Sequence, residues 1–142
     1  MLFTQDRIRT RQMFRQALEK HQRGETLEPL EKQIASLLEE HPEYHAMLKS
    51  DDNVLDKDFT EQDGTDNPFL HLSLHLALRE QVGTDRPAGI ASITRSLLLK
   101  HDDGHKVEHL MIERLGLFLW DAQRQGRAPD EQAYLDSLRE LL

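Results

Sequence analysis

The sequence predicts an all-α protein, a single helical bundle of five or more helices, on the basis of three observations. Leucine is frequent whereas valine occurs only at positions 54, 82 and 107, and leucine packs well in helices while sheets favour β-branched residues. Apolar residues recur at a spacing of three or four over most of the chain, which is the period of an amphipathic helix. Proline and aspartate stand where helices would start, and glycine stands where they would stop.

The N-terminal half is expected to contain three helices followed by a long loop. The first helix begins near Thr4, whose hydroxyl is suited to cap it, and ends near Gly24. Pro29 is a natural first-turn residue of the second helix, and Pro42 ends that helix and opens a short third one. Residues 50–67 are acidic and rich in turn formers, and because their acids do not follow the order of an EF-hand loop, we expect a solvated loop.

Four further helices are expected in the C-terminal half. Asn67 is a capping residue before a helix over residues 68–82 that is apolar nearly all round, as is typical of a helix surrounded by others. Proline, aspartate and glycine then delimit three more helices, over residues 87–101, about 105–125, and from 129 to the C-terminal end.

The composition argues against several functional classes. The 142 residues suit one domain, residues 1–142, and the net charge of −8 argues against nucleic-acid partners and against an anionic membrane surface. The absence of cysteine excludes disulfides, a thiolate nucleophile, iron–sulfur clusters and cysteine-ligated zinc. No apolar run reaches the roughly 18 residues of a membrane span, and the charged start does not resemble a signal peptide. We therefore expect a cytoplasmic protein, and nothing in the composition argues against a homo-oligomer.

The spacing of the eight histidines is the most informative feature of the sequence. Three pairs are separated by four residues, and the last pair is followed after four more residues by a glutamate: His41/His45, His71/His75, and His105/His109 with Glu113. On a helix, residues four apart differ by about 40° and about 6 Å, so two imidazoles at this spacing can chelate one divalent ion. Helical bundles build interior metal sites by placing such helices side by side.

Each histidine also has a simpler interpretation. His21, His41 and His101 fall at expected helix C-termini, where an imidazolium interacts favourably with the helix dipole, so capping roles are expected for them. His71 and His75 are flanked by leucines that leave no solvated face, which predicts that both rings are buried. A buried imidazole needs partners for both nitrogens, and either a metal ion or a hydrogen-bonded polar core would supply them.

The longest expected helix has two half-apolar faces, and periodicity alone does not decide which face is buried. One face carries the histidines and the glutamate together with Ile112, Gly116 and Trp120. The opposite face carries Val107, Leu110, Arg114 and Leu117, and if it faced the core the histidines would be exposed. From His105 to Glu113 the helix rises about 12 Å, so one ion cannot bind all three residues, and either two ions bind or one residue orients a ligand.

Four segments of the chain are similar to motifs of a known family: HPEYH, NPFLHLSLHLALREQ, HKVEHLMIE, and LWDAQRQG followed by PDEQAYL. With them the sequence resembles a short proteobacterial family, named only as a domain of unknown function, over nearly the whole chain from about Phe3. The resemblance implies that His45, the two later histidine pairs and Glu113 occupy motif positions, and it implies no activity. Arg114 stands where cysteine is expected in the family, which argues against a thiol role at that position.

We therefore expect a divalent transition metal, Zn or Fe, bound inside the bundle by histidine and glutamate: His45, His71, His75, His105, His109 and Glu113. The ligand inventory is similar to that of haemerythrin-like bundles, but the scarcity of bridging carboxylates favours a single ion over a di-iron centre. Glu80, Glu108 and Glu113 are candidate general bases only if a metal-bound water exists, so catalysis stays open. The alternative hypothesis is a metal-free protein-interaction module whose histidines are hydrogen-bonded core and helix-cap residues.

Overall fold

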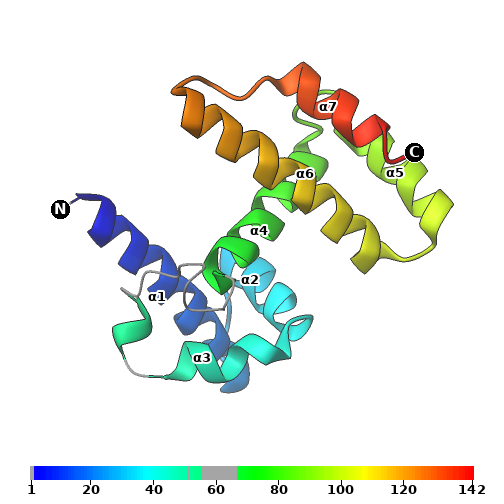
Figure 1. Ribbon diagram of the computed structural model, residues 1–142. Helices are drawn as coiled ribbons and strands as arrows, with labels where there is room; N and C mark the ends of the chain where they lie inside the picture. The colour runs from blue at the N-terminus through cyan, green and yellow to red at the C-terminus, as the bar shows by residue number, and fades with distance from the viewer. Residues whose placement is uncertain (1, 51, 56–66) are drawn as a thin grey trace. The chain divides into compact units, whose positions relative to one another are not determined.

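The computed structural model describes residues 2–50, 52–55 and 67–142, and every element of secondary structure in those residues is helical (Figure 1). In chain order the elements are α1 (Leu2–Gln22), α2 (Pro29–Glu39), the 3-10 turn η1 (Pro42–Tyr44), α3 (His45–Lys49), the 3-10 turn η2 (Asp52–Leu55), α4 (Pro68–Thr84), α5 (Ile90–His101), α6 (Gly104–Gln125) and α7 (Glu131–Arg139). The all-α prediction is confirmed.

Most helix boundaries lie close to those predicted, but α4 continues past Gly83 to Thr84, and α5 begins at Ile90 and not near Pro87. Asn67 caps α4 as predicted, because its side-chain oxygen accepts hydrogen bonds from the backbone N–H groups of Phe69 and Leu70 at 3.0 and 3.1 Å. Helix α1 begins at Leu2, before the predicted start near Thr4. Most of the expected acidic loop, residues 51 and 56–66, lies outside the described residues.

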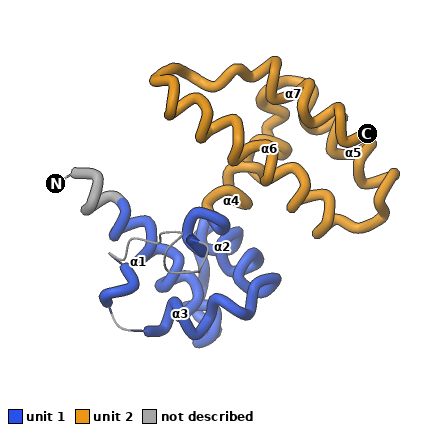
Figure 2. The backbone as a smooth tube through the Cα atoms, in the orientation of Figure 1, with its two compact units in different colours: residues 1–72 blue, residues 73–142 orange. Residues whose placement is uncertain are grey.

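The chain divides into two compact units, Met1–Leu72 and Ser73–Leu142 (Figure 2). Helix α4 begins in the first unit and continues into the second. Each unit has a hydrophobic core of its own. The expectation of one domain over residues 1–142 stays a prediction.

The core of the first unit forms where α1 packs on α2, with α3, η2 and the start of α4 contributing. Its most buried side chains are Phe14, Leu18, Ile34, Leu37, Leu38, Leu48 and Leu72. A charged residue, Arg11, is also buried, and its guanidinium donates to the backbone carbonyls of Val54 and Leu55 while lying 4.6 Å from the ring centre of Phe69. These carbonyls and the ring face offset the loss of hydration of the buried charge.

The core of the second unit lies between α5, α6, α7 and the C-terminal part of α4. Its buried side chains include Leu78, Ile90, Leu97, Val107, Met111, Leu115, Leu135 and Leu138. The hydroxyl of Tyr134 on α7 donates to the side-chain oxygen of Gln81 on α4 at 2.8 Å. Burial raises the pKa of Tyr134, so the phenol stays a donor and this bond persists across the physiological pH range.

The buried face of α6 lies between the two faces considered from the sequence. Val107, Met111, Ile112, Leu115 and Ala122 are buried, whereas Leu117 and Trp120 are 60% and 59% exposed. One predicted face thus contributes Val107 to the core and the other contributes Ile112, because α6 packs against both α5 and α7. Among the residues relevant to function, His109 is half-buried while His105 and Glu113 are exposed.

Candidate metal centre

In the first unit, His41 follows the end of α2 and is almost completely buried, with 3% of its surface exposed. Its ring Nδ1 lies 3.0 Å from the backbone oxygen of Leu37. A carbonyl oxygen can only accept a hydrogen bond, so Nδ1 carries the hydrogen. In the neutral ring the other nitrogen, Nε2, is therefore unprotonated and can bind a metal ion.

The partner of His41 in the same unit is His71, which lies in the first turns of α4. The two Nε2 atoms are 3.3 Å apart, and the ring centres are 5.2 Å apart in an edge-on arrangement. This separation allows a hydrogen bond from His71 to His41. It also equals the about 3.3 Å that separates two nitrogens on one tetrahedral zinc ion, given metal–nitrogen bonds of about 2.0–2.1 Å.

The ring of Tyr44 in η1 covers this pair. It stacks on His41 with ring centres 5.6 Å apart and planes within 5° of each other, and it meets His71 edge-on at 6.2 Å. The flat contact limits rotation of the His41 ring. Together with the Leu37 carbonyl, it fixes the direction in which Nε2 of His41 points.

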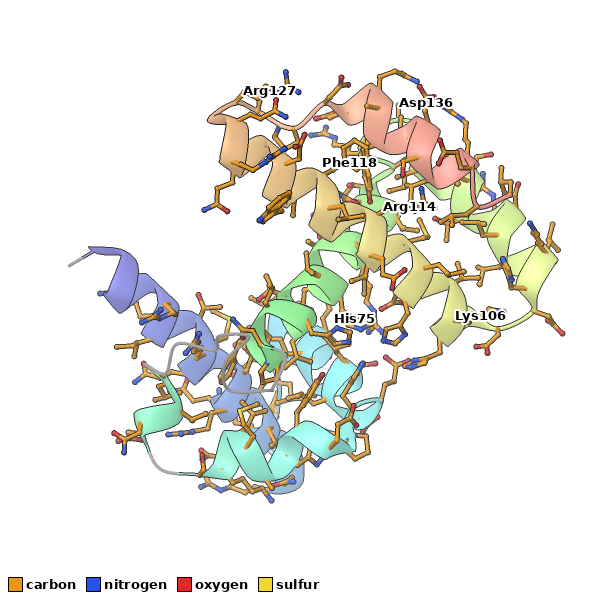
Figure 3. All side chains as sticks on the ribbon, viewed as in Figure 1. His75, Lys106, Arg114, Phe118, Arg127 and Asp136 are labelled. Carbon is orange, nitrogen blue, oxygen red and sulfur yellow. The ribbon has the colours of Figure 1, made fainter. Side chains whose placement is uncertain are left out.

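In the second unit, His75 on α4 is 1% exposed, and Figure 3 shows its position on that helix. Its Nδ1 donates a short hydrogen bond to the carboxylate of Glu108 on α6. The same carboxylate oxygen accepts a hydrogen bond from Arg79 at 3.0 Å. Burial raises the pKa of Glu108, but the bond from His75 and the charge of Arg79 lower it more, so this pKa lies below its usual value and the side chain is a carboxylate at neutral pH.

The partner of His75 in this unit is His109 on α6, whose ring lies 4.9 Å away, nearly perpendicular at 86°. The Nδ1 of His109 donates to the backbone oxygen of His105 at 2.8 Å, so its Nε2 is also unprotonated in the neutral ring. The ring of His105 packs against His109 with centres 4.1 Å apart. This unit therefore presents a second pair of imidazoles, each held through Nδ1.

A sequence model of the family described as Domain of unknown function (DUF1841) matches residues 6–140, which include every residue of both pairs. The chain belongs to the DUF1841 family. No curated protein and no solved structure matches it. The expected membership of a domain-of-unknown-function family is thereby confirmed, while the proteobacterial origin and the family motifs stay predictions.

Three histidines of this DUF1841 chain are oriented in the same way. His41, His75 and His109 each donate through Nδ1 to a fixed acceptor, which leaves Nε2 as the ligand atom in all three. With His71 they are a set of four histidines that forms one pair in each unit, and each ring could offer one nitrogen to a metal ion. Acceptors of this kind are typical partners of metal-binding histidines.

Three residues predicted as ligands lie outside this set of four. His45 is half-buried, and its Nε2 donates to the backbone oxygen of Leu38 at 2.7 Å. His105 is exposed and contributes its backbone oxygen and a ring contact rather than a ligand atom to the set. Glu113 is exposed, and the carboxylate that contacts a histidine of the set is that of Glu108.

The sequence did not indicate the roles of two residues of the candidate metal centre. His41 was expected to cap a helix, and its bond to the carbonyl of Leu37 does so, but that bond occupies only one of the two ring nitrogens. Glu108 was considered only as a general base. A usable signal existed for it, because a glutamate directly before His109 is next to a ligand candidate, but its contact with His75 depends on how α4 and α6 pack.

No helix in the described part of the DUF1841 chain is both long enough and apolar enough to cross a membrane.

Proposed function

We propose that this protein binds a divalent transition metal ion through the Nε2 atoms of histidines from two pairs, His41 with His71 in the first unit and His75 with His109 in the second. The observation that supports this most strongly is the orientation of three of these rings by Nδ1 bonds to a carbonyl or a carboxylate. A metal ion binds an unprotonated ring nitrogen, and a bond from Nδ1 makes Nε2 that nitrogen in the neutral ring.

Helix α4 is the reason for proposing one ion rather than two. It supplies one histidine to each pair, His71 and His75, and these are four residues apart on a single helix. Side chains at this spacing lie on the same helix face about one turn apart, so both rings can reach a common ion.

Four neutral imidazoles suit Zn²⁺ and are also compatible with Fe²⁺, Cu²⁺ and Ni²⁺. A tetrahedral Zn²⁺ would be saturated by four protein ligands, which is the arrangement of structural rather than catalytic zinc. We therefore propose a stabilising role for the ion, with zinc as the first choice. The alternative is a metal-free polar core, which the 3.3 Å separation of His41 and His71 also permits as a hydrogen bond.

Metal content measured on protein purified without an affinity tag separates the two functions. We expect about one equivalent of metal per chain, reduced strongly in His75→Ala and in His109→Ala. Because ligands of one ion act as a unit, the double variant should lose little more than either single variant. His21→Ala is the matched control, since His21 is exposed and pairs with Glu39.

Two results would contradict the proposed function. One is a protein that contains no metal and takes up neither Zn²⁺ nor Co²⁺ when these are added. The other is a loss of metal in His21→Ala as large as that in His75→Ala, which would indicate binding by exposed histidines. Retention of the helical circular dichroism spectrum in each variant shows that the chain is still folded.

A further inference from the structure

We infer that Glu108 is a positioning residue of the metal centre, which holds His75 and thereby sets the affinity for the ion. This inference rests on the proposed function, because it concerns how one of the proposed ligands is prepared. It assigns a role to a carboxylate that does not itself bind the metal ion. It also assigns that role to position 108 and not to Glu113.

The geometry around the carboxylate is the first support. His75 and Arg79 are four residues apart on α4, so both side chains extend from the same face of that helix. One oxygen of Glu108 accepts from Nδ1 of His75 and from Nε of Arg79. The carboxylate is partly buried, with 22% of its side chain exposed, so water competes little for these bonds.

The second support is what this arrangement does to the imidazole. A carboxylate is a stronger acceptor than the carbonyls that hold His41 and His109, because it carries a charge. It fixes the tautomer and the direction of the His75 ring and makes Nε2 a more basic ligand. Arg79 donates to the same carboxylate oxygen, which helps to keep the carboxylate aligned with His75.

Glu113 provides a matched control. It lies on the same helix as Glu108, has the same side chain and is exposed. It follows His109 by four residues, about 6 Å further along the helix. If a negative charge anywhere on this part of α6 raised the metal affinity, both glutamates would matter. If the contact with His75 matters, only Glu108 will.

The test is a competition titration of Zn²⁺ and a direct titration of Co²⁺ on the full chain. We expect Glu108→Ala to weaken binding about 10- to 100-fold, the range measured when such partners of metal-bound histidines are removed. Glu108→Gln keeps an acceptor oxygen but removes the charge, so its loss should be smaller. Glu113→Gln should bind as the unsubstituted protein does.

A spectroscopic readout separates positioning from a merely structural role. In the metal-free protein, the ¹⁵N signals of His75 should report the Nδ1–H tautomer, and Glu108→Ala should shift them toward a mixture of tautomers. A purely structural glutamate would lower the melting temperature without changing these signals. Glu108→Gln, close in shape to the native residue, keeps the test valid if Glu108→Ala is poorly folded.

The outcomes distinguish this inference from the proposed function. Failure of the unsubstituted protein to bind Zn²⁺ or Co²⁺ overturns both. Normal binding by the unsubstituted protein, combined with unchanged affinity and unchanged His75 signals in the Glu108 variants, overturns only the role of Glu108. An equal loss of affinity in Glu113→Gln also overturns it, because the effect would then be that of charge alone.

Discussion

The two ring nitrogens of His41 have different partners. Nδ1 donates to the carbonyl of Leu37, which lies in the last turn of α2 and also accepts from the backbone N–H of Glu40 at 3.1 Å. Nε2 faces His71. Capping and metal binding are therefore compatible in one residue, since they use opposite sides of the imidazole.

This dual role gives a prediction for His41→Ala. The variant should lose metal, and even without metal it should be less stable by about 1–3 kcal/mol, because a buried hydrogen bond is lost and a cavity is formed. His109→Ala should lose metal to a similar degree but cost less stability in the metal-free protein, because His109 is only half-buried. Urea unfolding with a chelator present, compared with metal content, measures the two effects separately. Equal destabilisation by both variants would contradict this reasoning.

At the scale of single residues, the sequence predicted part of the candidate site. The i, i+4 spacing indicated His71, His75 and His109 as ligand candidates, and the structure places each of them against another histidine. The spacing of residues along one helix does not show which residues of other helices pack against them. The contact of Glu108 with His75 and that of His41 with His71 join distant segments of the chain, so the spacing of residues along one helix did not reveal them.

At the scale of the helices, the start of α4 contains both a stabilising helix cap and one of the candidate metal ligands. The side-chain oxygen of Asn67 accepts from the backbone of Phe69 and Leu70, and His71 follows directly. Asn67→Ala should cost about 1 kcal/mol of stability and let the first turn of α4 fray. Amide hydrogen exchange over residues 68–71 should become faster. Asn67→Asp, which keeps the accepting oxygen, should leave both quantities close to their original values.

The helix α6 shows why burial could not be read from periodicity. Both of its faces are about half apolar in the sequence, and the buried strip contains residues from each. A helix that contacts a neighbour on either side needs apolar residues over a wide arc, which weakens the distinction between inside and outside. The helix ends were easier to predict, because caps are local features of the chain.

At the scale of the whole molecule, metal removal should lower thermal stability. An ion that binds the folded chain and not the unfolded one stabilises it by about 2.7 kcal/mol when present at 100 times its Kd. We therefore expect a chelator to lower Tm at pH 7.5. Protons compete with a metal ion for the imidazole nitrogens, so the effect of the chelator should shrink as the pH is lowered. An unchanged Tm at pH 7.5 in protein shown to have lost its metal would contradict a stabilising ion.

The all-α fold class could be predicted because the leucine-rich composition and the helix-capping residues are present throughout the sequence. The division into two compact units was not. Domain boundaries are recognised in sequences by flexible linkers rich in proline, glycine or polar residues. Here the boundary falls between Leu72 and Ser73, inside the continuous helix α4, where the sequence has no such signal.

The stacking of Tyr44 on His41 has a practical consequence for identifying the ion. An aromatic ring in flat contact with a metal-binding imidazole experiences the electronic change when that imidazole is coordinated. The chain contains only two tyrosines, and the other, Tyr134, is in the second unit with its hydroxyl bound to Gln81. Tyr44 thus gives the protein an intrinsic optical reporter. We expect its near-ultraviolet absorbance to change when the proposed metal ion binds, a measurement that needs no added dye.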